Sequence, residues 1–179
     1  MKKKNIPNLL SILRILLVPC FVFLFYNEHL LLALVVFLFA GLTDVVDGYL
    51  ARHYGWTSDV GKILDPFADK LMQCAVLVSF ATKQMIPLWL PLIYISKELL
   101  MGIGAIFVFK KKNRVVKSAF WGKFAVCVFY ASIVGLVLVN RYVTGAAAAV
   151  LQAVISVVML GFALLALLQY FRQYFRSKS

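Results

Sequence analysis

Six long apolar stretches alternate with short polar connections along the chain. Each stretch is about as long as the roughly 20 residues that a helix needs to cross the hydrocarbon core of a bilayer. We find no linker, low-complexity run or second domain between them. The pattern predicts an all-α, polytopic membrane protein with one domain over residues 1–179 and six transmembrane helices, at about residues 6–26, 30–51, 63–82, 86–109, 119–139 and 144–169.

The composition supports this prediction. Hydrophobic residues make up 63% of the 179 residues and charged residues only 15%, and the mean hydropathy is +0.91. Soluble domains are typically about 45–50% apolar and about 25% charged. A chain of this size leaves roughly a third of its surface exposed, so the surplus apolar surface must face lipid. A soluble enzyme, a nucleic-acid-binding domain and a disordered chain are therefore excluded.

The basic residues predict the topology. Of the 19 Lys and Arg, fourteen collect on one side of the membrane, only Lys83 and Arg141 fall on the other, and three lie deeper in the predicted spans. Because cytoplasmic segments carry an excess of Lys and Arg, both termini are expected in the cytoplasm. No small-residue cleavage site follows the first stretch, so we expect it to be a retained span rather than a signal peptide. The basic residues expected on the cytoplasmic side are Lys2, Lys3, Lys4, Arg52, Lys62, Lys70, Lys110, Lys111, Lys112, Arg114, Lys117, Arg172, Arg176 and Lys178.

Acidic residues are rare and concentrated. Five of the seven lie between Asp44 and Asp69. Asp44 and Asp47 are three residues apart on the second stretch, so they share a helix face. Asp65 and Asp69 are four apart at the start of the third stretch and also share a face. The short connection predicts antiparallel neighbouring helices, with all four carboxylates meeting about two turns inside the cytoplasmic surface.

Four carboxylates in a medium of low dielectric require protonation or countercharge. With no His or Cys ligand nearby, hard oxygen donors favour Mg²⁺ or Mn²⁺ over zinc. Gly48 and Gly61 leave room for a ligand to approach, and Arg52 offers a fork for phosphate oxygens. Together these features predict a pyrophosphate site. The alternative is that the acids only form structural ion pairs inside the membrane, which would explain neither the glycines nor the fixed spacing. The cations available for such pairs are Arg14, Lys62, Lys70, Lys97 and Lys123.

The segment reads Asp-x-x-Asp-Gly-x-x-Ala-Arg, then eight residues, then Gly-x-x-x-Asp-x-x-x-Asp. This pattern resembles the signature of the CDP-alcohol phosphatidyltransferase family, and the likeness extends over essentially the whole chain. The opening from Asn5 to Arg14 also resembles the start of the phosphatidylglycerophosphate synthases and related cardiolipin synthases of that family. Every defining position of the signature is filled, by Asp44, Asp47, Gly48, Ala51, Arg52, Gly61, Asp65 and Asp69.

The resemblance implies a six-helix membrane fold, often a homodimer, with a polar cavity open to the cytoplasm. It implies two metal ions, Mg²⁺ or Mn²⁺, held by Asp44, Asp47 and Asp65, with Asp69 as a further ligand and as the catalytic base. The acceptor hydroxyl would attack the phosphorus of CDP-diacylglycerol and release CMP. The pocket for the CDP-lipid would be lined by Asn8, Thr43, Gly48, Ala51, Arg52 and Gly61.

Arg14, Lys97 and Lys123 lie inside predicted spans, where charged groups usually line a cavity and carry function. The resemblance implies glycerol 3-phosphate as acceptor, with these three cations around its phosphate. Two alternatives are that Arg14 and Lys123 extend to the membrane interface, and that Glu98, beside Lys97, pairs with a neighbouring helix.

The identity of the acceptor stays open, because two positions depart from the synthase pattern. Lys97 stands where an Arg is usual, and Phe124 follows Gly122-Lys123 in place of a Lys-Thr extension. A cardiolipin synthase that uses phosphatidylglycerol is the first alternative, and a phosphatidylinositol-phosphate synthase is a more distant one. An ion-coupled transporter would also contain buried carboxylates. Transporters, however, tend to show inverted repeats, and here the acids form one cluster with no second half.

Overall fold

The computed structural model describes residues 6–54, 61–112 and 120–176, with side chains for residues 8–50, 53–54, 61, 64–102 and 122–172. Every element in the described residues is an α-helix, which confirms the all-α prediction. In chain order the helices are α1 (Ile6–Tyr26), α2 (Leu30–His53), α3 (Gly61–Thr82), α4 (Trp89–Lys112), α5 (Phe120–Tyr142) and α6 (Ala146–Arg176).

Four of these helices are long and apolar enough to cross a membrane. They contain candidate spans at Asn8–Tyr26, Leu30–Leu50, Gly122–Tyr142 and Ala146–Arg172. Many large hydrophobic side chains on them are exposed, Phe23 by 67% and Leu16 by 63% among them. Apolar surface of this extent is suited to lipid, so the chain is a membrane protein. That α3 and α4 also span the bilayer stays a prediction.

Four helix boundaries differ from the predicted ones by three residues or more: α4 and α5 end three residues late, at Lys112 and Tyr142, and the start of α4 and the end of α6 differ for local reasons. α4 begins at Trp89 and not near residue 86, because Pro87 disfavours helical backbone at the residue before it. α6 continues to Arg176, well past residue 169, because Arg and Gln, the polar residues beyond that point, are good helix formers. It starts after Gly145, whose φ of 72° is in the region that favours glycine.

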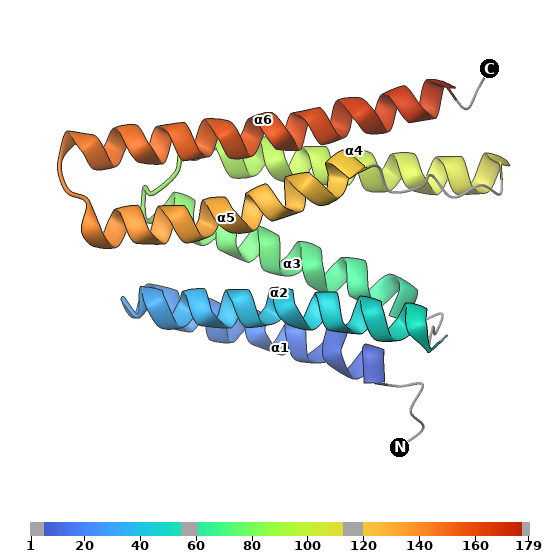
Figure 1. Ribbon diagram of the computed structural model, residues 1–179, viewed down its shortest axis with the longest axis horizontal. Coiled ribbons are helices and arrows are strands. Elements are labelled where there is room, and N and C mark those ends of the chain that lie inside the picture. The colour runs from blue at the N-terminus through green and yellow to red at the C-terminus, as the bar shows by residue number, and fades with distance from the viewer. Residues whose placement is uncertain (1–5, 55–60, 113–119, 177–179) are drawn as a thin grey trace. The chain divides into compact units, whose positions relative to one another are not determined.

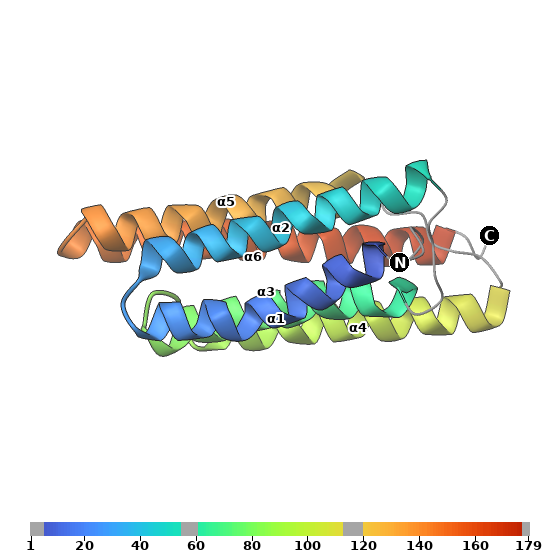
Figure 2. The same cartoon turned by 90° about the horizontal axis from the view of Figure 1, so that it is seen from below.

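By its contacts the chain divides into two compact units, Met1–Phe80 and Ala81–Ser179. The interpretation of residues 1–179 as one domain stays a prediction. In the first unit, α1 and α2 pack side by side as an antiparallel pair (Figures 1 and 2). The turn between them is a Schellman motif. Glu28 has a φ of 65°, and the His29 N–H donates to the Leu24 carbonyl oxygen at 3.0 Å.

Aromatic side chains fill the core of the first unit. Phe21, Phe25 and Phe80 are each 1% exposed, and the ring centroids of Phe25 and Phe80 are 5.1 Å apart. This contact joins the C-terminal ends of α1 and α3, whereas a hydrogen bond from Ser11 to Asp65 joins their N-terminal parts. The two helices are therefore parallel to each other, and α3 runs antiparallel to α2, as the sequence predicted.

The packing of this core predicts that two phenylalanines of α1 contribute very differently to stability. We expect Phe25→Ala to cost about 3–5 kcal/mol of stability, because it leaves a cavity among packed rings. Phe23→Ala is the matched control: its side chain is exposed and its loss opens no cavity. Thermal unfolding of the purified protein in detergent micelles measures both. Equal losses for the two variants would show that Phe25 is not packed as described.

In the second unit, α6 packs against both α5 and α4. The α5–α6 hairpin is the orange and red pair of Figure 1. Phe124 of α5 and Phe162 of α6 have ring centroids 5.3 Å apart. Nearer the turn of the hairpin, a Cβ atom added to Gly135 of α5 would lie 3.3 Å from the side chain of Ile155 of α6. The glycine therefore lets the two helices approach closely, as small residues do between membrane helices.

Candidate active site

Arg14 of α1 lies beside the first pair of acids. Its side chain is buried, with 1% of the residue exposed. Its Nη2 donates a hydrogen bond to Asp47 Oδ2 at 2.6 Å, and its Nη1 lies 2.7 Å from Asp44 Oδ1. One guanidinium contacts both carboxylates, so Asp44 and Asp47 do share a face of α2. The alternative in which Arg14 extends to the membrane interface is wrong.

The two acids differ in their surroundings. The Asp47 side chain is 3% exposed, whereas that of Asp44 is 43% exposed. Thr43 beside them is buried, and its hydroxyl donates to the Ala40 carbonyl oxygen at 2.7 Å. The hydroxyl therefore has a partner within its own helix. Asp44 is the accessible member of the pair and Asp47 the enclosed one.

The second acid pair is contacted by the same helix. Asp65 of α3 accepts a hydrogen bond from the hydroxyl of Ser11, which is itself fully buried. Ser11 and Arg14 are three residues apart, so one face of α1 contacts the acids of α2 and of α3. Ser11 was not among the predicted site residues. The signal was present, since a Ser and an Arg at helical spacing form a polar stripe on an apolar helix.

Asp69 has polar neighbours on its own helix. Gln73 Nε2 donates to Asp69 Oδ2 at 3.0 Å, and Lys70 Nζ lies 3.8 Å from the same oxygen. Lys70 also donates to Gln73 Oε1 at 3.4 Å. Gln73 was missed as well, although its position four residues after Asp69 places it on the same face. These contacts orient the carboxylate while leaving its side chain 23% exposed.

The acids suit a divalent cation chemically. Among the described side chains, no three His, Cys, Asp or Glu residues come close enough together to hold a metal ion as they stand. Their donors are nevertheless all carboxylate oxygens, the ligands that Mg²⁺ and Mn²⁺ prefer. A cationic group, the Arg14 guanidinium, already lies against Asp44 and Asp47. The place is therefore one at which positive charge is stabilised.

The residues predicted to bind the CDP-lipid are described only in part. Asn8 and Gly48 are half-buried and Gly61 is buried. The side chains of Ala51 and Arg52 lie outside the described residues, although their backbone belongs to α2. The binding role of this set stays a prediction.

Two of the cations predicted for the acceptor lie in the second unit. Lys97 of α4 is 5% exposed; it forms an ion pair with Glu98, and its Nζ lies 4.4 Å from the centroid of the Tyr94 ring. Lys123 lies in the first turn of α5 and is exposed. Arg14 belongs to the first unit, so the grouping of these three cations around one phosphate stays a prediction.

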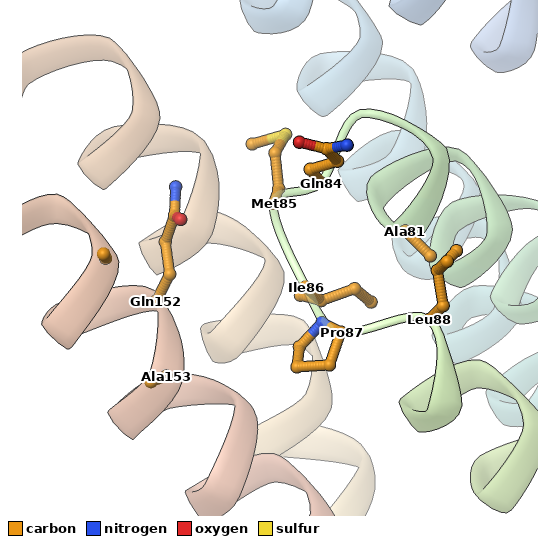
Figure 3. A pocket seen from close by; sticks show the side chains of 9 residues that line it. Ala81, Gln84, Met85, Ile86, Pro87, Leu88, Gln152 and Ala153 are labelled. Atoms are coloured by element: carbon orange, nitrogen blue, oxygen red, sulfur yellow. The ribbon is translucent and has the colours of Figure 1, made fainter.

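The second unit also contains a pocket of about 340 Å³. Figure 3 shows side chains of the segment between α3 and α4 on one side of it, with Gln152 and Ala153 of α6 on the other. None of the predicted site residues belongs to its lining, which consists of Ala81, Gln84, Met85, Ile86, Pro87, Leu88, Ala149, Gln152 and Ala153.

The fold and the site define a class: a helical membrane protein with two acidic pairs on α2 and α3, each contacted by a polar group of the first helix. The sequence model of the family described as CDP-alcohol phosphatidyltransferase matches residues 4–169. The chain therefore belongs to the CDP-alcohol phosphatidyltransferase family. It is accordingly a transferase, which disfavours the alternative of an ion-coupled transporter.

Individual relatives agree with the family. The protein from Aquifex aeolicus named CDP-diacylglycerol–glycerol-3-phosphate 3-phosphatidyltransferase is 33% identical over 140 residues, which cover 77% of this chain and 78% of that protein. The protein of the same name from Pseudomonas fluorescens is 44% identical over 104 residues, covering 55% of this chain and 53% of that protein. The human protein named cardiolipin synthase (CMP-forming) is 41% identical over 104 residues, 58% of this chain and 34% of that protein.

Proposed function

We propose that this chain transfers the phosphatidyl group of CDP-diacylglycerol to glycerol 3-phosphate and releases CMP, as a step in phospholipid synthesis. Family membership supports the reaction class, and the names of the Aquifex and Pseudomonas relatives support the two substrates. The observation that carries the proposal is the arrangement of the acids. The pairs on α2 and α3 are both contacted from one face of α1, by Arg14 and Ser11.

In this proposal Asp69 is the base. It takes the proton from the acceptor hydroxyl as that oxygen bonds to the phosphorus on the lipid side of the pyrophosphate. The bond from this phosphorus to the bridging oxygen breaks, and CMP leaves with that oxygen. The partial exposure of the Asp69 side chain and its hydrogen bond from Gln73 support this role, because a base must be both accessible and oriented.

Asp44, Asp47, Asp65 and Asp69 would hold two divalent cations, Mg²⁺ or Mn²⁺. Cations bound there would neutralise the negative charge of the pyrophosphate and of the departing CMP. Asn8, Thr43, Gly48, Ala51, Arg52 and Gly61 would line the pocket for the CDP-lipid, and Arg14, Lys97 and Lys123 would bind the acceptor phosphate.

The proposal includes the topology. All six helices would cross the membrane, with both termini and the active site on the cytoplasmic side, and the protein would form a homodimer in the inner membrane of a bacterium. The distribution of basic residues supports the orientation. α3 is amphipathic at its start, where Asp65, Asp69 and Lys70 lie, and these charges suit a helix that lines a polar cavity.

The direct test is CMP release by the purified protein with CDP-diacylglycerol and Mg²⁺. We expect release that depends on added glycerol 3-phosphate and stops when the cation is chelated. Release without any acceptor would indicate a hydrolase, and cation flux in liposomes without lipid turnover would restore the transporter.

Phosphatidylglycerol is the alternative acceptor, because the human protein named cardiolipin synthase aligns with more than half of this chain. Phosphatidylglycerol in place of glycerol 3-phosphate distinguishes the two enzymes in the same assay. If only phosphatidylglycerol supports CMP release, the reaction class stands and the acceptor proposed here is wrong.

The acceptor pocket gives a prediction for Lys123. Lys123→Ala removes a positive charge from the proposed phosphate site, so we expect the KM for glycerol 3-phosphate to rise about tenfold or more, with little change for CDP-diacylglycerol. Lys83→Ala, an exposed lysine between α3 and α4, is the matched control. An unchanged KM would place the acceptor phosphate elsewhere.

A further inference from the structure

The ion pairs of Arg14 raise a question about how the acids accept a divalent cation. The guanidinium lies against Asp44 Oδ1 at 2.7 Å and against Asp47 Oδ2 at 2.6 Å. Both carboxylates belong to the proposed cation site. A carboxylate oxygen this close to a guanidinium nitrogen has lost much of its attraction for a second cation.

We propose that Arg14 is the resting countercharge of the Asp44–Asp47 pair, and that its guanidinium and the divalent cation compete for these two carboxylates. The inference rests on the proposed metal site and goes beyond it, since Arg14 becomes a positioning residue that sets the affinity of that site. It also changes the role that the sequence suggested for Arg14, which was contact with the acceptor phosphate.

Burial makes a countercharge necessary. Asp47 is almost fully enclosed, and an ionised carboxylate in such a place costs several kcal/mol unless it is paired. The described side chains within reach of Asp47 offer it one cation, Arg14. Without a metal ion, the guanidinium therefore holds the carboxylates ionised and in place.

The pairing is also open to exchange. A guanidinium has five N–H donors. Among the described residues, Arg14 Nε and Nη1 have no hydrogen-bond partner, although Nη1 is within ion-pair distance of Asp44. A buried arginine with unsatisfied donors is not held as firmly as a fully bonded one. Asp44, which is 43% exposed, gives an arriving cation its first ligand.

Binding of Mn²⁺ to the full chain in detergent micelles, without substrate, tests the inference. Electron paramagnetic resonance gives the dissociation constant from the signal of free Mn²⁺. We expect Arg14→Gln to bind Mn²⁺ about five- to tenfold more tightly than the wild type, because the competing charge is gone. Arg14→Lys, which keeps the charge but loses the two-pronged contact, should fall between them. Arg141→Gln, an exposed arginine of α5, is the control and should match the wild type.

Thermal unfolding provides a second readout. Without metal, Arg14→Gln should unfold at a lower temperature than the wild type, and Mn²⁺ should raise its midpoint by more than it raises that of the wild type. If Arg14→Gln proves unfolded without metal, Arg14→Lys carries the binding test.

The outcomes separate the two proposals. If the wild type binds Mn²⁺ and the Arg14 variants bind it equally or more weakly, the competition is wrong and the metal site stands. If neither the wild type nor Arg14→Gln binds Mn²⁺, the metal site is wrong and the competition falls with it.

Discussion

Replacing Asp69 by Asn should lower CMP release by at least about 100-fold while the protein stays folded. General bases typically contribute 10²- to 10⁴-fold to a rate, and an amide cannot take the proton of the acceptor hydroxyl. The amide is close in size to the carboxylate and can still accept the hydrogen bond from Gln73. The measurement is CMP release with saturating CDP-diacylglycerol and glycerol 3-phosphate, together with a thermal unfolding curve.

Glu28→Gln is the matched control, because it removes a carboxylate from the exposed turn between α1 and α2. It should turn over at the wild-type rate. If Asp69→Asn does the same, another group is the base. A loss of turnover accompanied by unfolding would assign Asp69 a structural role instead.

The positions of the helices along the chain were predictable because they follow from the long apolar stretches. The starts and ends of α1 and α2 agree with the predicted ones to within two residues. The antiparallel relation of α2 and α3 followed from the short connection between them. The start of α4 was predicted too early, because Pro87 disfavours helical backbone at the residue before it and a count of apolar residues takes no account of this.

The contacts of the acids were less predictable. Their spacing predicted that all four would meet. Arg14 confirms that Asp44 and Asp47 share a face, whereas among the described side chains no three acids come close enough together to hold a metal ion as they stand. The metal site was predicted from α2 and α3, and α1 entered only through Arg14 as a candidate countercharge. The contribution of α1 depends on which face of an almost uniformly apolar helix turns inward, and hydrophobic periodicity is weak in such a helix. Ser11 was missed for this reason, since packing decides whether its polar stripe with Arg14 turns toward the acids. Gln73 could have been found from its helical spacing to Asp69 alone.

The difference in burial between Asp44 and Asp47 leads to the second large effect. We expect Asp47→Asn to lower the stability of the metal-free protein by about 3 kcal/mol, because a buried guanidinium then faces a neutral amide. Asp44→Asn is the matched control on the same helix face. Its carboxylate is 43% exposed, so water already weakens its ion pair, and its loss should cost less than about 1 kcal/mol.

Thermal unfolding in micelles with a metal chelator present compares the two variants. The proposed mechanism expects both to lose CMP release, since both acids would hold the cations, whereas only Asp47→Asn should also lose stability. The two measurements therefore separate the ligand role that the acids share from the structural role that belongs to Asp47. Equal stability losses would contradict the burial difference, and turnover by either variant would remove that acid from the metal site.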